Sequence, residues 1–122
     1  MAEAAKVVVN LATCLEDAER VTIAFLVAGA AAERGKQVAM FLTKEAVRLA
    51  LPGFAEAVAC EGCPPLALLF QQFAENGGEL LVCPICAKSR NLPEQLVDNA
   101  WLAGATPLWE WIGDEAASVF SY

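Results

Sequence analysis

The chain has 122 residues, of which 57% are hydrophobic and 19% are charged. That length is enough for one domain with a substantial core and too short for two, so we predict a single domain over residues 1–122. Eight Lys and Arg against fifteen Asp and Glu give a net charge of −7, and there is no histidine. The charge argues against a nucleic-acid partner. The lack of imidazole excludes histidine-dependent triads and histidine-ligated metals.

The N-terminal segment has no cationic cluster, so we do not expect a signal peptide. The longest strongly apolar stretch without charge covers residues 21–32, and a bilayer crossing needs about 20 residues. These features predict a cytoplasmic protein that does not enter a membrane. Cytoplasmic thiols stay reduced, so five cysteines in a short chain indicate reactivity or metal binding before a disulfide scaffold.

Strand and helix patterns alternate through the first two thirds of the chain. Buried strands are predicted where β-branched and aliphatic residues run without polar alternation, and helices where capping residues and glycines bound longer segments. In chain order we predict a strand over 6–11, a helix over 13–35 opened by a Thr13 and Glu16 capping box, a strand over 37–43, helical segments over 45–51 and 54–59, a helix from Pro64 to Asn76, and a strand over 79–82.

The last third has weaker patterns. A cationic, helix-capable stretch contains Lys88 and Arg90, and Pro93 is predicted to open a helix that runs through Val97 toward Gly104. The fourth and fifth strands are predicted over 106–111 and 118–122, which would place Trp109 and Trp111 on one face of a strand.

Strands that alternate with helices predict an α/β fold: a three-layer α/β/α sandwich around a mainly parallel sheet of five strands. The helix around residues 21–32 is apolar on nearly every side, more than one sheet face can cover. We therefore expect a second subunit to cover it, and hence a homo-oligomer. The alternative is that its Ala and Gly residues only allow close packing within one chain.

The five cysteines are expected at one edge of the sheet. Cys14 follows the first strand, Cys83 ends the third with Cys86 just after it, and Cys60 and Cys63 precede a helix. In a parallel sheet the carboxyl ends of the strands and the starts of the helices share the edge where ligands bind. Arg20 could face this crevice, near Cys14, and bind an anion, or it could be a surface ion-pair partner.

Cys83 and Cys86 form the more specific pair. A thiol at a helix start faces free backbone N–H groups, and the nearby charges of Lys88 and Arg90 would also lower its pKa. We predict Cys83 as the nucleophile and Cys86 as a thiol that resolves a persulfide or sulfenic acid on it. The same pair could instead serve simple thiol–disulfide redox chemistry.

A second hypothesis needs a cofactor. The spacing of Cys60, Cys63, Cys83 and Cys86 falls within the range of four-cysteine zinc sites, which would make the protein a structural or interaction module that binds Zn²⁺. A whole apolar helix and a buried strand separate the two pairs, unlike the compact zinc ribbons. The sulfur hypothesis needs no cofactor.

From Lys6 to the C-terminus the sequence resembles the DsrE/DsrF-like sulfur relay family. The most specific element is Gly77-Gly78-Glu79-Leu80-Leu81-Val82-Cys83, with Arg90 a few positions on. The resemblance implies an α/β sandwich that assembles as trimers or hexamers of like or homologous subunits. It also implies a cysteine at the place of Cys83 that accepts sulfane sulfur as a persulfide, with partner proteins as donor and acceptor. Asn91 stands where relay members carry glycine, and Cys60, Cys63 and Cys86 are additional to the basic pattern.

Overall fold

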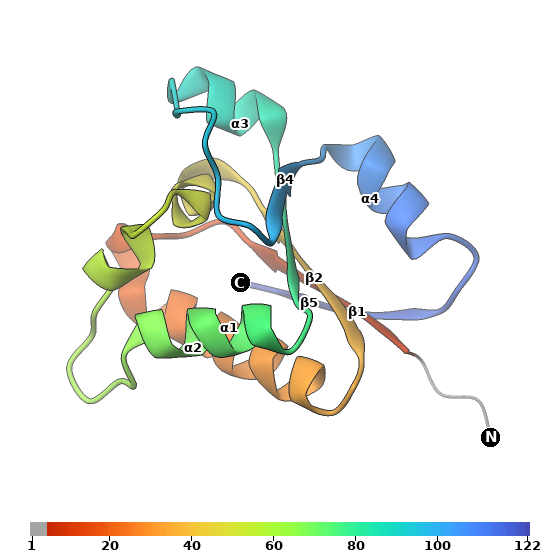
Figure 1. Cartoon of the computed structure of the whole chain (residues 1–122), viewed down its shortest axis with the longest axis horizontal. Helices are drawn as coiled ribbons and strands as arrows, with labels where there is room; N and C mark the ends of the chain where they lie inside the picture. The colour runs from red at the N-terminus through yellow and green to blue at the C-terminus, as the bar shows by residue number, and fades with distance from the viewer. Residues whose placement is uncertain (1–4) are drawn as a thin grey trace.

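A computed structural model describes residues 5–122 as one α/β domain with a single five-stranded sheet (Figure 1). The strands are β1 (Lys6–Leu11), β2 (Gln37–Leu42), β3 (Glu79–Val82), β4 (Ala100–Leu102) and β5 (Ala117–Ser121). All neighbouring pairs are parallel, in the order β4-β3-β2-β1-β5. The predicted fold class is confirmed.

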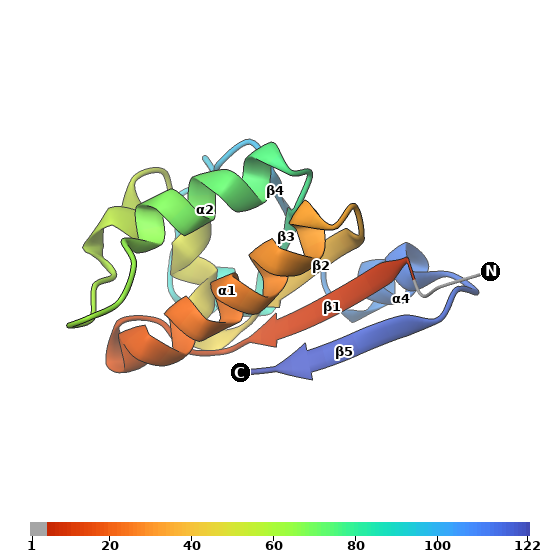
Figure 2. The same ribbon diagram turned by 90° about the horizontal axis from the view of Figure 1, so that it is seen from below.

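Two helices cover one face of the sheet and a third covers the other (Figures 1 and 2). α1 (Ala18–Glu33) and α2 (Leu66–Glu75) pack over the side chains that alternate inward from the central strands, as in Val9, Met40 and Leu80. α4 (Ala105–Ile112) packs on the opposite face, against Ala39 and Leu81. Because side chains alternate along a strand, the apolar runs of β1 to β3 serve both faces at once.

The remaining elements are short and lie at or near the carboxyl edge of the sheet. They are the 3-10 segments η1 (Leu15–Asp17), η2 (Lys44–Ala50) and η3 (Phe54–Ala57), and the helix α3 (Pro84–Ser89). No helix in residues 5–122 is long and apolar enough to span a membrane.

α2 of the same chain covers the extra apolar side of α1. Phe25 of α1 lies against Phe70 and Phe73 of α2, with ring centroids 5.6 and 5.8 Å away. The sheet and α2 together therefore explain why α1 is apolar on several sides, and this feature does not by itself call for a second subunit. The alternative of close packing within one chain describes α1 better.

The helix predicted from Pro93 and the strand predicted over 106–111 are wrong. The chain from Pro93 to Asp98 has no regular structure and leads into β4, while residues 106–111 belong to α4. Proline is tolerated in the first turn of a helix, where Pro107 lies. Leu108 and Trp111, three residues apart, both pack onto the sheet, a helical rather than a strand spacing.

The start of α1 also differs in detail from the predicted capping box. Asp17 is the N-cap residue, and its carboxylate accepts the backbone N–H of Arg20 at 3.1 Å. Glu16 instead accepts the backbone N–H of Cys14 at 2.9 Å. The hydroxyl oxygen of Thr13 is buried and has no hydrogen-bond partner among residues 5–122.

Candidate functional site

The predicted nucleophile lies where β3 passes into α3. The backbone N–H of Cys83 extends the ladder with β2 by donating to the carbonyl of Leu42 at 3.0 Å. Its own carbonyl accepts the N–H of Ala87 at 3.0 Å, which starts the helix. Cys83 is thus the N-cap residue of α3, with Pro84 as the first helical residue, a favoured place for proline. The strand holds Cys83 at the carboxyl edge of the sheet, as predicted.

Cys83 and Cys86 are both free thiols and both partly exposed. An N-cap residue and the third residue of the helix face each other across one turn, so the two side chains are neighbours on α3. Within the described chain, no hydrogen bond reaches the Cys83 sulfur.

Cys14 has a different environment from the α3 thiols. It follows β1 at the same edge but is only 1% exposed and belongs to the main core. Burial raises the pKa of the Cys14 thiol from 9.0 to about 11. A neutral, enclosed thiol is a poor nucleophile, so Cys14 has a packing role in this structure.

This difference gives a prediction for alkylation. With a pKa of about 11, about one Cys14 thiol in a thousand is ionised at pH 8. We expect iodoacetamide to modify Cys14 about 100-fold more slowly in the folded protein than in denaturant at pH 8, with the sites identified by peptide mass. The raised pKa also means that Cys14 contributes stability below pH 9 that is lost as pH rises toward 11. A Cys14 that reacts as fast as in the unfolded chain would contradict the assignment.

Cys60 and Cys63 form a disulfide in the loop between η3 and α2. This loop and α3 occupy separate places along the carboxyl edge (Figure 1). No group of three or more Cys, Asp or Glu side chains in residues 5–122 is arranged to hold a metal ion. The arrangement that the zinc hypothesis requires, four thiolates around one point, is therefore not formed: one pair is bridged and the other lies on α3.

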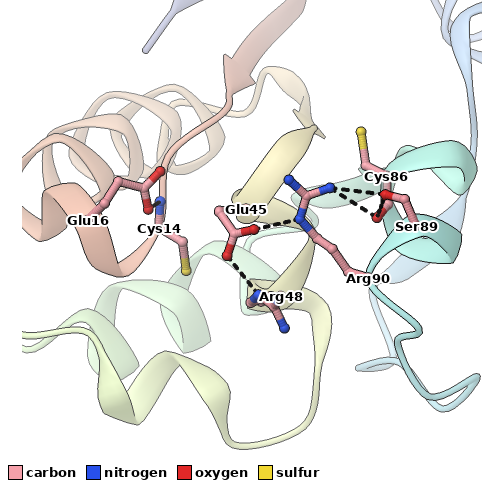
Figure 3. Close-up of polar contacts among 7 residues, drawn as sticks. All are labelled: Cys14, Glu16, Glu45, Arg48, Cys86, Ser89 and Arg90. Atoms are coloured by element: carbon pink, nitrogen blue, oxygen red, sulfur yellow. Dashed lines mark hydrogen bonds and ion pairs between the residues drawn. The ribbon is translucent and has the colours of Figure 1, made fainter.

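The Arg90 side chain contacts Glu45 rather than a thiol. Its Nε donates to Glu45 Oε2 at 2.6 Å, and its Nη1 donates to the Cys86 carbonyl oxygen at 3.3 Å (Figure 3). Arg90 thus ties the C-terminal end of α3 to η2. Lys88, on the last turn of α3, is exposed and makes no ion pair within the described part of the chain.

Glu45 is a site residue that the sequence interpretation missed. It also accepts the Nε of Arg48 at 2.8 Å, so one carboxylate joins two guanidinium groups (Figure 3). Arg48 and then Arg90 lower the pKa of Glu45 below its usual value by hydrogen bonding and charge. The Glu45-x-x-Arg48 spacing just after β2 was the available signal for the local pair. The link to Arg90 spans 45 residues and has no local signature.

The lowered pKa predicts an acid dependence of stability. Glu45 contributes stability above the pKa that it has in the unfolded chain, and this contribution is lost as pH falls through its lower folded value. We expect Glu45→Gln to lower the thermal midpoint at pH 7 and to reduce the further fall between pH 5 and pH 3. Glu56→Gln, at an exposed carboxylate, is the matched control. Equal pH profiles for the two variants would rule out the Glu45 contribution.

Asn91 lies in the turn after α3, where the resemblance led us to expect glycine. Its φ is +52°, in the left-handed region where glycine is most favoured and asparagine is among the next best residues. Asn91 therefore supplies the left-handed residue in the turn that follows α3.

Gly77 and Gly78 have separate reasons to be glycine. Gly77 has φ +87° and ends α2. At Gly78 an added Cβ would collide with the Phe73 ring, which is fully buried. The Gly-Gly element thus turns the chain out of α2 and lets β3 begin directly against the core, four residues before Cys83.

An apolar hollow of about 430 Å³ adjoins α3. Its apolar lining consists of Pro84, Ala87, Leu92, Leu96 and Leu102, and its charged lining residues are Lys88 and Glu94. Pro84 is the residue next to Cys83, so a molecule bound in this hollow would contact the first turn of α3 beside the thiol.

Arg20, predicted at the crevice, is exposed and pairs with Asp17 at 3.2 Å. It lines a shallow hollow of about 310 Å³ that also contains Asp17 and Glu19. Two carboxylates beside one guanidinium do not favour a bound anion, so the geometry fits the surface ion pair.

Comparisons with known proteins agree with the fold. The model of the DsrE/DsrF-like family matches residues 6–121. The crystal structure of the YchN protein from E. coli superposes with a TM-score of 0.76 at 17% identity and covers 96% of this chain and 98% of that one. A conserved protein of unknown function, BT1422 from Bacteroides thetaiotaomicron, gives a TM-score of 0.65 at 16% identity, with both chains fully covered. No curated protein matches the chain.

Proposed function

Because the chain belongs to the DsrE/DsrF-like family, we propose that it is a sulfur relay protein that accepts sulfane sulfur on Cys83 as a persulfide. One observation carries the proposal. Of the five cysteines, Cys14 is buried and Cys60 and Cys63 are bridged, which leaves Cys83 and Cys86 on α3 as the free, partly exposed thiols. The place of Cys83 after the Gly-Gly strand element agrees with this role.

The transfer is a displacement at sulfur. The Cys83 thiolate attacks the terminal sulfur of a donor persulfide, RSSH, and the S–S bond of the donor breaks. The donor leaves as RS⁻, and Cys83 becomes Cys83–S–SH. An acceptor thiolate then attacks the terminal sulfur of this persulfide and restores the Cys83 thiolate. We propose donor and acceptor proteins as partners and a cytoplasmic setting, since the carrier thiol must stay reduced between cycles. The Cys60–Cys63 disulfide is the exception to the expectation that the thiols of this chain are reduced.

Cys86 provides a second reaction for the protein that carries a persulfide on Cys83. Its thiol can attack the Cys83 sulfur of the persulfide, forming a Cys83–Cys86 disulfide and releasing the terminal sulfur as H₂S. The position of the two residues at the N-cap and one turn into α3 favours this reaction. The same geometry supports a plain dithiol–disulfide redox role as the second candidate function.

Lys88 and Arg90 are the cations of the α3 segment. Arg90 is partly neutralised by Glu45, so its main effect on Cys83 is to hold α3 in place. Lys88 is the cation at the adjoining hollow, where Glu94 is also present, and would contact an anionic donor such as a polysulfide.

We also propose that the protein is a homo-oligomer, a trimer or hexamer. The edge strand β5 exposes Val119 and Phe120, neighbours that point to opposite faces of the sheet, and Trp109 of α4 is 70% exposed. Large exposed apolar side chains of this kind are typical of interfaces. Light scattering of the purified chain tests this assembly, and a monomer at micromolar concentration would exclude it.

The experiment for sulfur uptake uses the whole chain and inorganic polysulfide. After brief reduction and incubation, intact mass should show the addition of one sulfur atom, and peptide mapping should place it on the peptide that contains Cys83. Sulfur found mainly on Cys14, Cys60 or Cys63, or no uptake at all, would overturn the proposal.

A further inference from the structure

The Cys60–Cys63 disulfide lies outside the proposed relay site. The two residues are the first and last of a tight turn, in which the backbone N–H of Cys63 donates to the Cys60 carbonyl at 3.1 Å. Gly62, inside this turn, has φ +79°, which glycine adopts readily. The backbone therefore holds the two cysteines together, with Cα atoms 5.3 Å apart, and would continue to do so after the S–S bond is broken.

A structural role explains this disulfide poorly. A disulfide stabilises mainly by closing a long loop of the unfolded chain, and the effect is smallest when few residues are enclosed. Here only two residues, Glu61 and Gly62, lie between the cysteines. The bond therefore adds little to the stability of the domain.

The pair is open to solvent on one side. Cys60 and Cys63 are both partly exposed, and the residues around them, Glu61, Gly62 and Pro64, are exposed. A thiol in solution can therefore approach the bond along the loop, in contrast to the buried Cys14.

The two sulfur atoms have different surroundings. The Cys60 sulfur lies 3.6 Å from the hydroxyl oxygen of Thr22, a residue of α1 that is 3% exposed. The Thr22 hydroxyl also reaches the carbonyl of Ala18 at 2.8 Å. Because a hydroxyl can turn, its proton can move from that carbonyl to a sulfur atom that becomes negative. No hydrogen bond reaches the Cys63 sulfur within residues 5–122.

We propose that Cys60–Cys63 is a second reactive site, which exchanges electrons with a dithiol reductant. One thiolate of the reductant attacks the Cys63 sulfur and the Cys60–Cys63 bond breaks. Cys60 leaves as a thiolate that the Thr22 hydroxyl stabilises and that then takes a proton. The second thiol of the reductant attacks the mixed disulfide on Cys63, so the reductant leaves as a disulfide and both cysteines become thiols. Two electrons and two protons pass to the protein.

The experiment is done in the full chain with Cys83→Ser and Cys86→Ser, so its outcome does not depend on the sulfur relay. Dithiothreitol is added to the folded protein, the reaction is quenched with alkylating agent in denaturant, and new thiols are counted by mass. We expect two new thiols, on Cys60 and Cys63, and reclosure of the bond when oxidised glutathione is added. A bond that opens only after unfolding, or that does not reclose, would overturn the proposal.

Thr22 variants separate chemistry from packing. Thr22→Val keeps the shape of the side chain and loses the hydroxyl, and we expect reduction about fivefold slower, the effect of one ordinary hydrogen bond. Thr22→Ser keeps the hydroxyl and should keep the rate. If Val and Ser variants with equal thermal midpoints react at the same rate, Thr22 has no part in the step.

Single variants assign the attacked sulfur. In the same background, Cys60→Ser leaves Cys63 free, and Cys63→Ser leaves Cys60 free. The Cys63 thiol is expected to form a mixed disulfide with oxidised glutathione several times faster than the Cys60 thiol, which lies against α1. The reverse order would reject the proposed direction of attack.

Discussion

Cys83→Ser is expected to reduce polysulfide uptake at the α3 thiols by at least about tenfold, whereas Cys86→Ser should leave uptake in place. The reason is positional. Cys83 is the N-cap residue between β3 and α3, next to the first turn of the helix, while Cys86 lies one turn inside it. Intact mass of each variant after polysulfide treatment measures the difference. Equal uptake by the two variants would show that the sulfur has no preferred site.

Comparison of the parent protein with Cys86→Ser separates sulfur carriage from sulfide release. In the parent protein the Cys86 thiol can displace H₂S from the Cys83 persulfide, so the bound sulfur is expected to disappear with time and free sulfide to appear. In Cys86→Ser this route is closed, and the persulfide should persist. Sulfide release that is unchanged in Cys86→Ser would exclude Cys86 as the resolving thiol. A parent protein that never releases sulfide would favour carriage without resolution.

The cysteine positions along the fold could be predicted because strand and helix order fixes which loops share an edge. The patterns around β1, β2 and β3 are long enough to identify, and in a parallel sheet they place Cys14, Cys83 and the α3 residues at one edge. The pattern could not show how deeply each cysteine side chain is buried. Cys14 and Cys83 both follow a strand, yet Cys14 is enclosed by the core and Cys83 is not.

The errors at the C-terminal end have a local cause. β4 has three residues, too few for a period to be visible, and the Thr and Trp residues of α4 favour strands when judged by propensity alone. Contacts distant in sequence decide the outcome: the indole N–H of Trp111 donates to Glu79 at 3.1 Å, and Lys6 binds the carbonyl oxygens of Trp111 and Ile112 at the helix end. The Glu45–Arg90 pair, 45 residues apart in sequence, likewise depends on the folded chain.

Gly78→Ala is expected to cost about 3 kcal/mol of folding free energy, the upper part of the range for overpacking a core. The added methyl group would overlap the ring of Phe73, which is fully buried and packs edge to face against Phe25. The backbone cannot easily yield in the other direction, because the N–H of Gly78 donates to the Phe73 carbonyl at 2.8 Å. Urea unfolding gives the change in free energy, provided that the slope is unchanged.

Two other glycines serve as controls for this prediction. Gly29, within α1, has open space around an added Cβ, so Gly29→Ala should be stabilising by roughly 0.5–1 kcal/mol. Gly77 also has open space but φ +87°, so Gly77→Ala should cost only about 1–2 kcal/mol, from the left-handed backbone. A Gly78→Ala variant as stable as Gly29→Ala would contradict the role of the Phe73 contact.

A double variant tests the cause directly. Phe73→Leu alone should destabilise the domain by leaving a cavity beside Phe25. In the Gly78→Ala background the smaller side chain makes room for the methyl group. The double variant should therefore lose less folding free energy than the two single variants together, by about 1 kcal/mol or more. Because only β3 separates Gly78 from Cys83, the displaced strand in Gly78→Ala should also slow sulfur uptake, and Phe73→Leu should partly restore it. Strict additivity of the two free energies would place the strain of Gly78→Ala elsewhere.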